Sequence, residues 1–284
     1  MKKMIAIVMV IVIISRVPVF GEESHELNID SKSCVLMESS TGMVLYENNQ
    51  NEKLSPASIT KIMTLVLIFD AIHSGKIKLT DVATTSAYAK SMGGSQVFLE
   101  EGETQTVETL IKCIIIASGN DASVVMAEMI AGSEEAFVKK MNERAKSLGM
   151  NNTHFIDCCG LTDSDDHYTT AYDLYLIFSE FIKHDLAYLI DSLTSYDFTY
   201  TDANGETRSV TLEATNGYIS GEFQFPEGYS LGSWKSGTTT AAGNCLILEF
   251  VKDDTGDKYI AVIAGAEDRS TLYNDMTMLI NTAK

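Results

Sequence analysis

Residues 54–73 read LSPASITKIMTLVLIFDAIH, a proline turn followed by an almost unbroken apolar run. From Ser58 onward the apolar residues fall on nearly every side of a helix, which is typical of a helix buried at the centre of a domain. Ser58 and Lys61 lie near its start, and a spacing of three places both side chains on one face. Gly75 is expected to end the helix. The chain is therefore expected to fold around one central helix that begins with two polar groups.

Strand patterns occur near both ends of the chain, and helical periodicity fills the middle. Short apolar runs at 34–38 and 43–47 flank a Ser-Ser-Thr-Gly turn, which predicts a β-hairpin. Residues 76–185 are expected to form a mostly helical stretch, and this indicates an all-helical insert. We therefore predict an α/β fold in which the N- and C-terminal parts form one antiparallel sheet with flanking helices. The remaining predicted elements are strands at 209–214, 229–235, 244–251 and 259–265, and helices at 107–117, 122–131, 134–148, 171–183 and 270–283.

The first 21 residues have the pattern of a secretory signal peptide. Lys2 and Lys3 precede an apolar run at 4–14, and small residues follow before a possible cleavage point. The run is shorter than the roughly 20 apolar residues that span a bilayer, unless an uncleaved leader extends it. We predict that residues 22–284 form a domain outside the cytoplasm, attached to a membrane only if the leader is uncleaved.

Composition excludes several classes of function. With 284 residues, 45% of them hydrophobic, the chain can bury a full core, and its formal net charge of -18 makes nucleic acid an unexpected partner. No H-E-x-x-H or C-x-x-C spacing occurs, so neither a metal nor another cofactor is predicted. The adjacent Cys158 and Cys159 are unusual, and two interpretations stay open, buried small residues or a redox pair. The other cysteines are Cys34, Cys113 and Cys245.

The first polar motif, Ser58-Ile59-Thr60-Lys61, has the residues that an activated serine needs. A serine hydroxyl requires a base, and a lysine serves if burial and a neighbouring cation lower its pKa. Backbone N–H groups at the helix N-terminus favour an oxyanion near the serine. The alternative is structural: Ser58 caps the helix while Lys61 extends to solvent.

Two further motifs, Ser118-Gly119-Asn120 and Lys235-Ser236-Gly237, each occur once. The first lies between two predicted helices, where a loop can present two polar side chains, although Asn120 could simply cap the next helix. The second ends a predicted strand, where Lys235 could bind a carboxylate and Gly237 could let an extended substrate approach the backbone. An ordinary turn is the alternative for that motif.

Together the motifs resemble the Ser-x-x-Lys, Ser-x-Asn and Lys-Thr/Ser-Gly signatures of penicillin-recognising serine enzymes. The surrounding segments 54–64, 116–122 and 235–245, and the segment HYTTAYD at 167–173, look like the D-alanyl-D-alanine carboxypeptidase family, the low-molecular-weight penicillin-binding proteins. The resemblance runs from about residue 35 to 280. It implies a β-lactamase/transpeptidase-like fold and a secreted serine peptidase of the bacterial cell envelope.

The resemblance also implies roles for three catalytic residues. Ser58 would attack the carbonyl between two D-alanines, while Lys61 accepts its proton. Ser118 would relay a proton to the leaving amine, and water would then release the acyl group. The implied substrates are peptidoglycan stem peptides, with β-lactam antibiotics as covalent inhibitors.

The implied substrate-binding residues come from the other two motifs. Asn120 would hold the substrate amide, and Lys235 with Ser236 would bind its terminal carboxylate. The backbone N–H groups of the nucleophile and of Thr238 would form the oxyanion hole, so the placement of the Gly237-Thr238 strand matters.

Three features depart from the family pattern. Residues 155–161, FIDCCGL, occur where the family usually has Asn-Pro-x-Gly-Leu, which leaves the shape of that loop open. Ser236 replaces the commoner threonine and keeps the hydroxyl. The sequence ends at Lys284, so we expect neither a small C-terminal β domain nor a membrane-anchoring helix after the catalytic domain.

Two alternative functions share these motifs. A class A β-lactamase would need a Glu-x-x-x-Asn loop between the second and third motifs, and no glutamate between Ser118 and Lys235 has Asn four residues later. A silent sensor domain would keep the fold without turnover. An α/β-hydrolase is disfavoured because no Gly-x-Ser-x-Gly occurs. The motifs do not separate carboxypeptidase, endopeptidase and transpeptidase activities, since these differ in the acceptor that reaches the acyl-enzyme.

Overall fold

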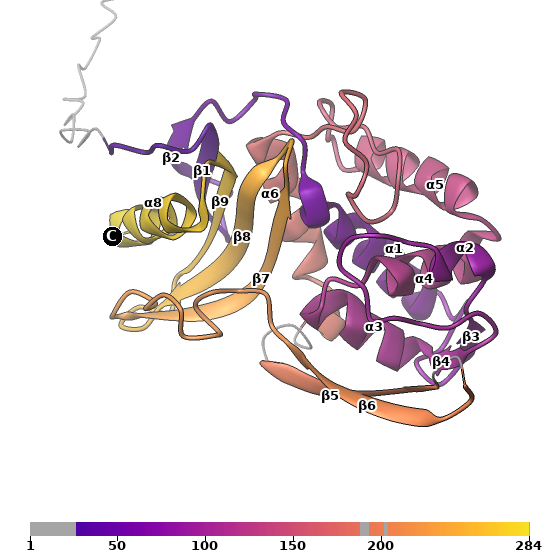
Figure 1. The fold of residues 1–284 in the computed structure, drawn as a ribbon. Coiled ribbons are helices and arrows are strands. Elements are labelled where there is room, and N and C mark those ends of the chain that lie inside the picture. Colours follow the sequence, from indigo (N-terminus) through magenta and orange to yellow (C-terminus); the bar gives the residue numbers. More distant parts are fainter. Residues whose placement is uncertain (1–26, 188–192, 202–203, 284) are drawn as a thin grey trace, which may run out of the picture.

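The computed structural model describes residues 27–187, 193–201 and 204–283. The predicted signal peptide, residues 1–21, lies outside the described residues. Figure 1 shows a sheet with a helix on its outer side, next to a group of helices with a long two-stranded ribbon below. The strands are β1 (Ser33–Glu38), β2 (Val44–Asn48), β3 (Val82–Thr84), β4 (Thr104–Thr106), β5 (Ser195–Thr201), β6 (Thr207–Glu213), β7 (Tyr229–Thr239), β8 (Gly243–Lys252) and β9 (Lys258–Ala266). The helices are η1 (Ala57–Thr60), α1 (Lys61–His73), α2 (Ala87–Lys90), α3 (Val107–Ile116), α4 (Asn120–Ala131), α5 (Glu134–Ser147), α6 (Ala171–Phe181), η2 (Asp185–Ala187) and α8 (Arg269–Thr282).

The main sheet joins the two ends of the described chain, as the sequence predicts. Its strand order is β2-β1-β9-β8-β7, and all neighbours are antiparallel. The hairpin β1–β2 pairs with β9, so that Leu36 lies opposite Ala261. α8 packs on β8 and β9, and α6 packs on β1, β8 and β9 from the side of the other helices (Figure 1). The sheet therefore has helices on both faces, and β7 is one of its edges.

The central helix α1 is buried among other helices, which confirms the prediction from its apolar run. It packs against α4, α5 and α6. It begins at Lys61, whereas the sequence pattern placed its start at Ser58. Ser58 instead lies in the 3-10 turn η1, where the Ile59 N–H donates to Pro56 O and Ala57 has a left-handed backbone, φ 47°. We call residues Ala57–Thr60 the Ser58 turn.

Two predictions about the arrangement of strands need correction. The stretch 76–185 is mostly helical, but it is not all-helical, because it contains the short antiparallel pair β3–β4. Strands of three residues are too short to leave a recognisable alternation in a sequence. The strand predicted at 209–214 exists as part of β6, yet it pairs with β5 in a separate two-stranded ribbon and not in the main sheet.

No helix in residues 27–187, 193–201 and 204–283 combines the length and the apolar character needed to cross a bilayer.

Candidate active site

The Ser58 turn brings the first motif together. Lys61 begins α1 directly after the turn, and its Nζ lies 2.9 Å from Ser58 Oγ. Lys61 is fully buried, while Ser58 is partly exposed. A buried amine next to a reachable hydroxyl is the geometry that a serine nucleophile and its base require.

The second and third motifs also meet. Lys235 Nζ donates to Ser118 Oγ at 3.0 Å and to Ser236 O at 2.7 Å. Ser118 has a left-handed backbone, φ 56°, an uncommon conformation for a residue with a side chain. Lys235 lies inside β7, which continues to Thr239, so the third motif does not end the strand as the sequence suggested.

β7 touches the Ser58 turn through Gly237. A Cβ atom added to Gly237 would lie 2.8 Å from the Ser58 backbone N and 3.0 Å from the Ile59 backbone N. A side chain at this position would therefore press on the N–H groups of the turn. Beyond the glycine, Thr238 is exposed, and its Oγ1 donates to Asn244 Oδ1 at 3.1 Å. The hydroxyl of Ser236 lies 2.7 Å from that of Thr215.

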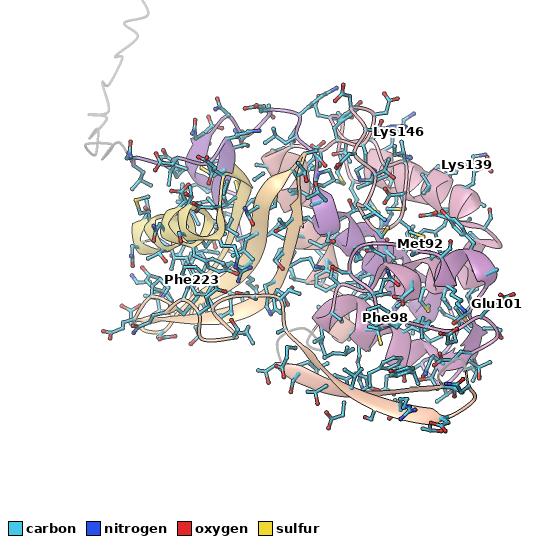
Figure 2. All side chains as sticks on the ribbon, viewed as in Figure 1. Met92, Phe98, Glu101, Lys139, Lys146 and Phe223 are labelled. Carbon is cyan, nitrogen blue, oxygen red and sulfur yellow. The ribbon has the colours of Figure 1, made fainter. Side chains whose placement is uncertain are left out.

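Asn120 begins α4 and faces the loop that precedes β4. Its Nδ2 donates to Gly93 O at 2.7 Å, while its Oδ1 is buried without a hydrogen-bond partner in the described structure. The next residue, Asp121, accepts the N–H groups of Val97 and Leu99. Phe98 between them is left-handed, φ 61°, and 67% exposed (Figure 2). Asp121 thus holds a loop in which Phe98 has a strained backbone, and Asn120 next to it has an acceptor oxygen without a partner.

Burial lowers the pKa of both lysines. For Lys61, the neighbouring groups of Cys159, Cys158, Asp157 and Asp121, when ionised, oppose that effect. For Lys235 the pKa falls well below its ordinary value, because burial and the charge of Lys61 act in the same direction. Because two buried positive charges repel each other, one of the two amines is expected to be neutral. A neutral amine can accept a proton.

Sequence reasoning did not identify one part of the site, residues Asp157–Thr162, which we call the Asp157 loop. The carbonyl oxygen of Cys159 accepts a hydrogen bond from Lys61 Nζ at 2.7 Å, and that of Cys158 accepts one from Thr64 Oγ1 at 2.6 Å. Both thiols are free and buried. Two features of the sequence pointed to this loop, the unusual cysteine pair and the departure from the family pattern. Neither feature reveals that a backbone carbonyl of the pair accepts a hydrogen bond from Lys61.

His167 fixes the loop to the Ser58 turn. Its Nδ1 accepts the Ile156 N–H at 3.1 Å, so its Nε2 carries the proton and donates to Thr60 Oγ1 at 2.9 Å. Burial lowers the pKa of His167, which agrees with a neutral ring. The sequence offered this histidine only as part of the resembling segment 167–173.

One group of side chains that could ligate a metal occurs among the described residues. Oxygens of Glu134 and Asp157 and the sulfur of Cys159 lie within 4.8 Å of one another. The oxygens of Asp157 already accept backbone N–H groups of its own loop. We therefore assign no metal to this group.

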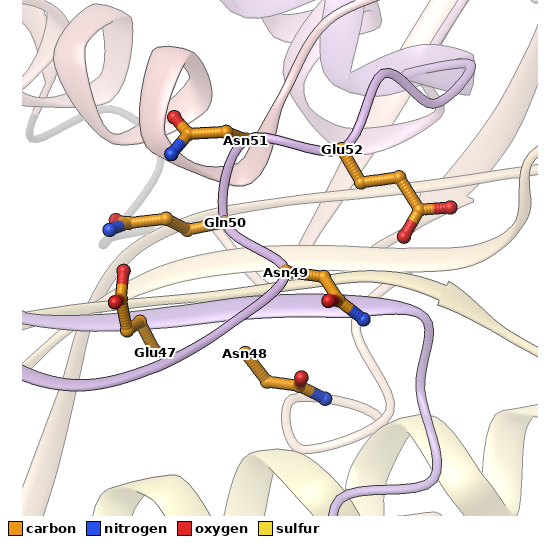
Figure 3. A pocket seen from close by; sticks show the side chains of 6 residues that line it. All are labelled: Glu47, Asn48, Asn49, Gln50, Asn51 and Glu52. Atoms are coloured by element: carbon orange, nitrogen blue, oxygen red, sulfur yellow. The ribbon is translucent and has the colours of Figure 1, made fainter.

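Two surface pockets lie elsewhere. One follows β2 and is lined by consecutive polar residues, 47–52, whose side chains Figure 3 shows spread in several directions. β2 is the edge of the sheet opposite to β7. The other lies between the start of α5 and Tyr88. Neither pocket is lined by a predicted site residue. We therefore define the candidate site by the contacts among β7, the Ser58 turn and the residues that lead into α4.

Comparison with known sequences identifies the family. A family model described as D-alanyl-D-alanine carboxypeptidase matches residues 21–268. The chain is 44% identical over 265 residues to D-alanyl-D-alanine carboxypeptidase DacF of Bacillus subtilis. This alignment covers 93% of the chain and 64% of the relative. It is 35% identical over 259 residues to D-alanyl-D-alanine carboxypeptidase DacC of Escherichia coli, with 89% and 61% covered. The chain thus spans about six-tenths of the length of these relatives.

Solved structures agree on the fold. Penicillin binding protein 6B from Escherichia coli aligns with a TM-score of 0.77 at 31% identity, covering 90% of this chain and 77% of the other. Penicillin binding protein 5 from Haemophilus influenzae aligns with a TM-score of 0.80 at 26% identity, covering 90% and 71%. The chain has the fold of the penicillin-binding proteins. It belongs to the D-alanyl-D-alanine carboxypeptidase family, which confirms the resemblance drawn from its motifs.

Proposed function

We propose that this protein is a serine-type D-Ala-D-Ala carboxypeptidase that removes the terminal D-alanine from peptidoglycan stem pentapeptides. The observation that carries the proposal is the pair of contacts between Ser58 Oγ and Lys61 Nζ, 2.9 Å, and between Ser118 Oγ and Lys235 Nζ, 3.0 Å. Both lysines are buried, so each hydroxyl has an amine of lowered pKa beside it. Family membership supplies the substrate class.

The acylation step uses the first pair and the lowered pKa of its lysine. Neutral Lys61 accepts the Ser58 proton as Oγ bonds to the carbonyl carbon of the penultimate D-alanine. The oxyanion is stabilised by the backbone N–H groups of Ser58 and Thr238, a contribution typically worth a hundredfold or more for one donor. Ser118 then relays the proton held by Lys61 to the leaving nitrogen as the C–N bond breaks, so Ser118 keeps its hydroxyl and Lys61 is neutral again. Water attacks the ester to release the shortened peptide and restore Ser58.

Substrate binding uses the charge and the free acceptor described above. The amine of Lys235, whose protonated form is favoured by an incoming carboxylate, and the hydroxyl of Ser236 bind the terminal carboxylate. The free Asn120 Oδ1 accepts a substrate N–H. Gly237 lets the substrate backbone lie against β7, since no side chain intervenes. β-Lactams carry a carboxylate and a strained amide, so the same groups bind them and Ser58 is acylated.

Incubation with a muramyl pentapeptide tests the proposal. The wild type should release D-alanine and retain a fluorescent penicillin on Ser58, identified by mass spectrometry of the labelled peptide. Ser58→Ala should lose both signals by at least about a thousandfold. Rapid release of hydrolysed penicillin would indicate a β-lactamase instead, and labelling without D-alanine release would indicate a sensor. D-alanine release that survives Ser58→Ala would refute the mechanism.

We also propose that the protein acts outside the cytoplasm. The family's substrates support this location, and the leader pattern of residues 1–21 supports export. N-terminal sequencing of the protein recovered from the envelope should begin near residue 22. An intact leader on the envelope form would indicate that it remains as an anchor.

A further inference from the structure

The Asp157 loop has no role in the mechanism given above, although it touches both parts of the Ser58 motif. We propose that Asp157 is a positioning residue: its carboxylate folds the loop so that the Cys159 carbonyl holds Lys61 Nζ against Ser58 Oγ. The inference rests on the proposed function, since it concerns how the base of that reaction is held.

The loop is coiled around the Asp157 side chain. Oδ1 accepts the N–H of Cys159 at 2.8 Å and that of Gly160, and Oδ2 accepts the N–H of Thr162 at 2.9 Å. Hydrogen bonds to an ionised acceptor are about twice as strong as neutral ones, and the carboxylate is largely shielded from water. Burial raises the pKa of Asp157, but the Thr162 side chain and the N–H groups of Gly160 and Thr162 donate to its carboxylate and lower the pKa overall. A charge on His167 would lower it further, but that ring is neutral.

This folding determines where the carbonyl groups point. With the N–H groups of Cys159 and Gly160 turned toward Asp157, the carbonyls of Cys158 and Cys159 point the other way, toward the first turn of α1. They accept from Thr64 and Lys61 respectively. Lys61 Nζ is thus held between Cys159 O, at 2.7 Å, and Ser58 Oγ, at 2.9 Å. Two fixed partners leave a long lysine side chain little freedom, which favours proton transfer from the serine.

The loop also packs directly on the Ser58 turn. A Cβ atom on Gly160, whose φ is +77°, would lie only 1.8 Å from Ala57 O. His167 ties the other end of the loop to Thr60. Displacement of the loop would therefore move the nucleophile and its base together.

Asp157 acts electrostatically as well. The charged or titratable groups that face Lys61 are Lys235 on β7, Asp121 on α4, and Asp157, Cys158 and Cys159 on the loop. Asp157 is ionised at neutral pH, so its charge raises the pKa of Lys61 against the lowering by burial. Removal of that charge should lower the pKa of Lys61. On the acidic side of its pH profile, the acylation rate depends on deprotonation of Lys61. This acidic limb of the profile should therefore move to lower pH.

Asp157→Asn tests both effects, and Asp163→Asn is the matched control. Asp163 is exposed on the following segment and loses the same charge in that variant. We expect Asp157→Asn to slow penicillin acylation at saturation about tenfold or more, with a smaller change in apparent affinity, and to shift the acidic limb to lower pH. Asp163→Asn should change neither. Wild-type kinetics in Asp157→Asn, or a slower rate without a shifted limb, would overturn the inference.

Thr64→Val provides a second test in case Asp157→Asn does not fold. It keeps the shape of the side chain but removes the hydrogen bond to Cys158 O, while the charge of Asp157 remains. Acylation should slow severalfold with the limb at its wild-type position, and an unchanged rate would count against the inference. If the wild type itself were not acylated at Ser58, the proposed function would fail. If it were acylated and the variants matched it, only the positioning role would fail.

Discussion

The Asp157 loop and strand β7 both pack on the Ser58 turn, and they bring different groups to it. Each presents a glycine to the turn, Gly160 against Ala57 O and Gly237 against the Ser58 N–H. The loop adds an ionised carboxylate and a carbonyl that accepts from Lys61. β7 adds a buried lysine that, within the described residues, has no carboxylate at ion-pair distance.

One turn is thus fixed from one side and left open to a ligand on the other. On the loop side the Asp157 carboxylate and the carbonyls of Cys158 and Cys159 all have hydrogen-bond partners within the protein, so the loop holds the Lys61 amine without a ligand. The β7 side has a buried amine whose hydrogen-bond partners, within the described residues, are the Ser118 hydroxyl and the Ser236 carbonyl. Burial disfavours the protonated form of this amine, and an incoming carboxylate would favour it. We therefore expect a side chain added at the loop glycine to affect mainly folding, and one added at the β7 glycine to affect mainly reaction with substrate.

The largest expected effect is that of Gly160→Ala on stability. The new Cβ would lie 1.8 Å from Ala57 O, a backbone atom that cannot move aside cheaply, and the left-handed backbone adds strain. We expect a loss of about 3 kcal/mol or more in the free energy of unfolding, measured by urea denaturation, or a loss of soluble protein. Gly75→Ala is the control: its φ is +73° with nothing within 4 Å, so it should cost only about 1–2 kcal/mol. Equal losses in both variants would show that the loop does not pack on the turn.

Gly237→Ala should lower activity more than stability. Its Cβ would lie 2.8 Å from the Ser58 backbone N, which is closer than real contacts allow, but no left-handed strain is added. Because the substrate and the oxyanion must occupy this same side of the turn, we expect penicillin acylation to fall by about a hundredfold or more. Gly232→Ala in the same strand is the control, since its nearest contact is the end of the Glu249 side chain. Similar acylation losses in the two variants would contradict the special position of Gly237.

The smallest expected effect is a change in how stability depends on pH. The pKa of Lys235 is lowered on folding, so between that lowered value and the ordinary lysine value of about 10.4 the unfolded state binds more protons. Stability should therefore rise with pH in this range, by at most about 1.4 kcal/mol per pH unit for one lysine. Lys235→Met should flatten the rise when urea unfolding is followed from neutral to alkaline pH. Lys183→Met, at an exposed position, should leave the slope unchanged, and parallel curves for wild type and Lys235→Met would refute the assignment.

Some features of the fold follow from local patterns alone. The apolar run of α1, the terminal hairpin and the strands of the sheet each have a periodicity that is visible in the sequence. The partner of a strand is less visible, as β6 illustrates: its alternation predicts a strand, but its pairing with β5 depends on a contact that alternation does not encode. The start of α1 was misplaced for a similar reason, because a 3-10 turn and the first turn of an α-helix share the same residue types.

The family, the central helix and the three motifs that contain the predicted site residues can all be recognised in the sequence alone. The contacts that bring Ser58, Ser118 and Lys235 together, and the hydrogen bond from Lys61 to the Cys159 carbonyl, are visible only in the tertiary structure. The physical reason is that motifs and periodicity are properties of neighbouring residues. Burial, a lowered lysine pKa and a carbonyl aimed at an amine arise only when distant segments exclude water from the same space.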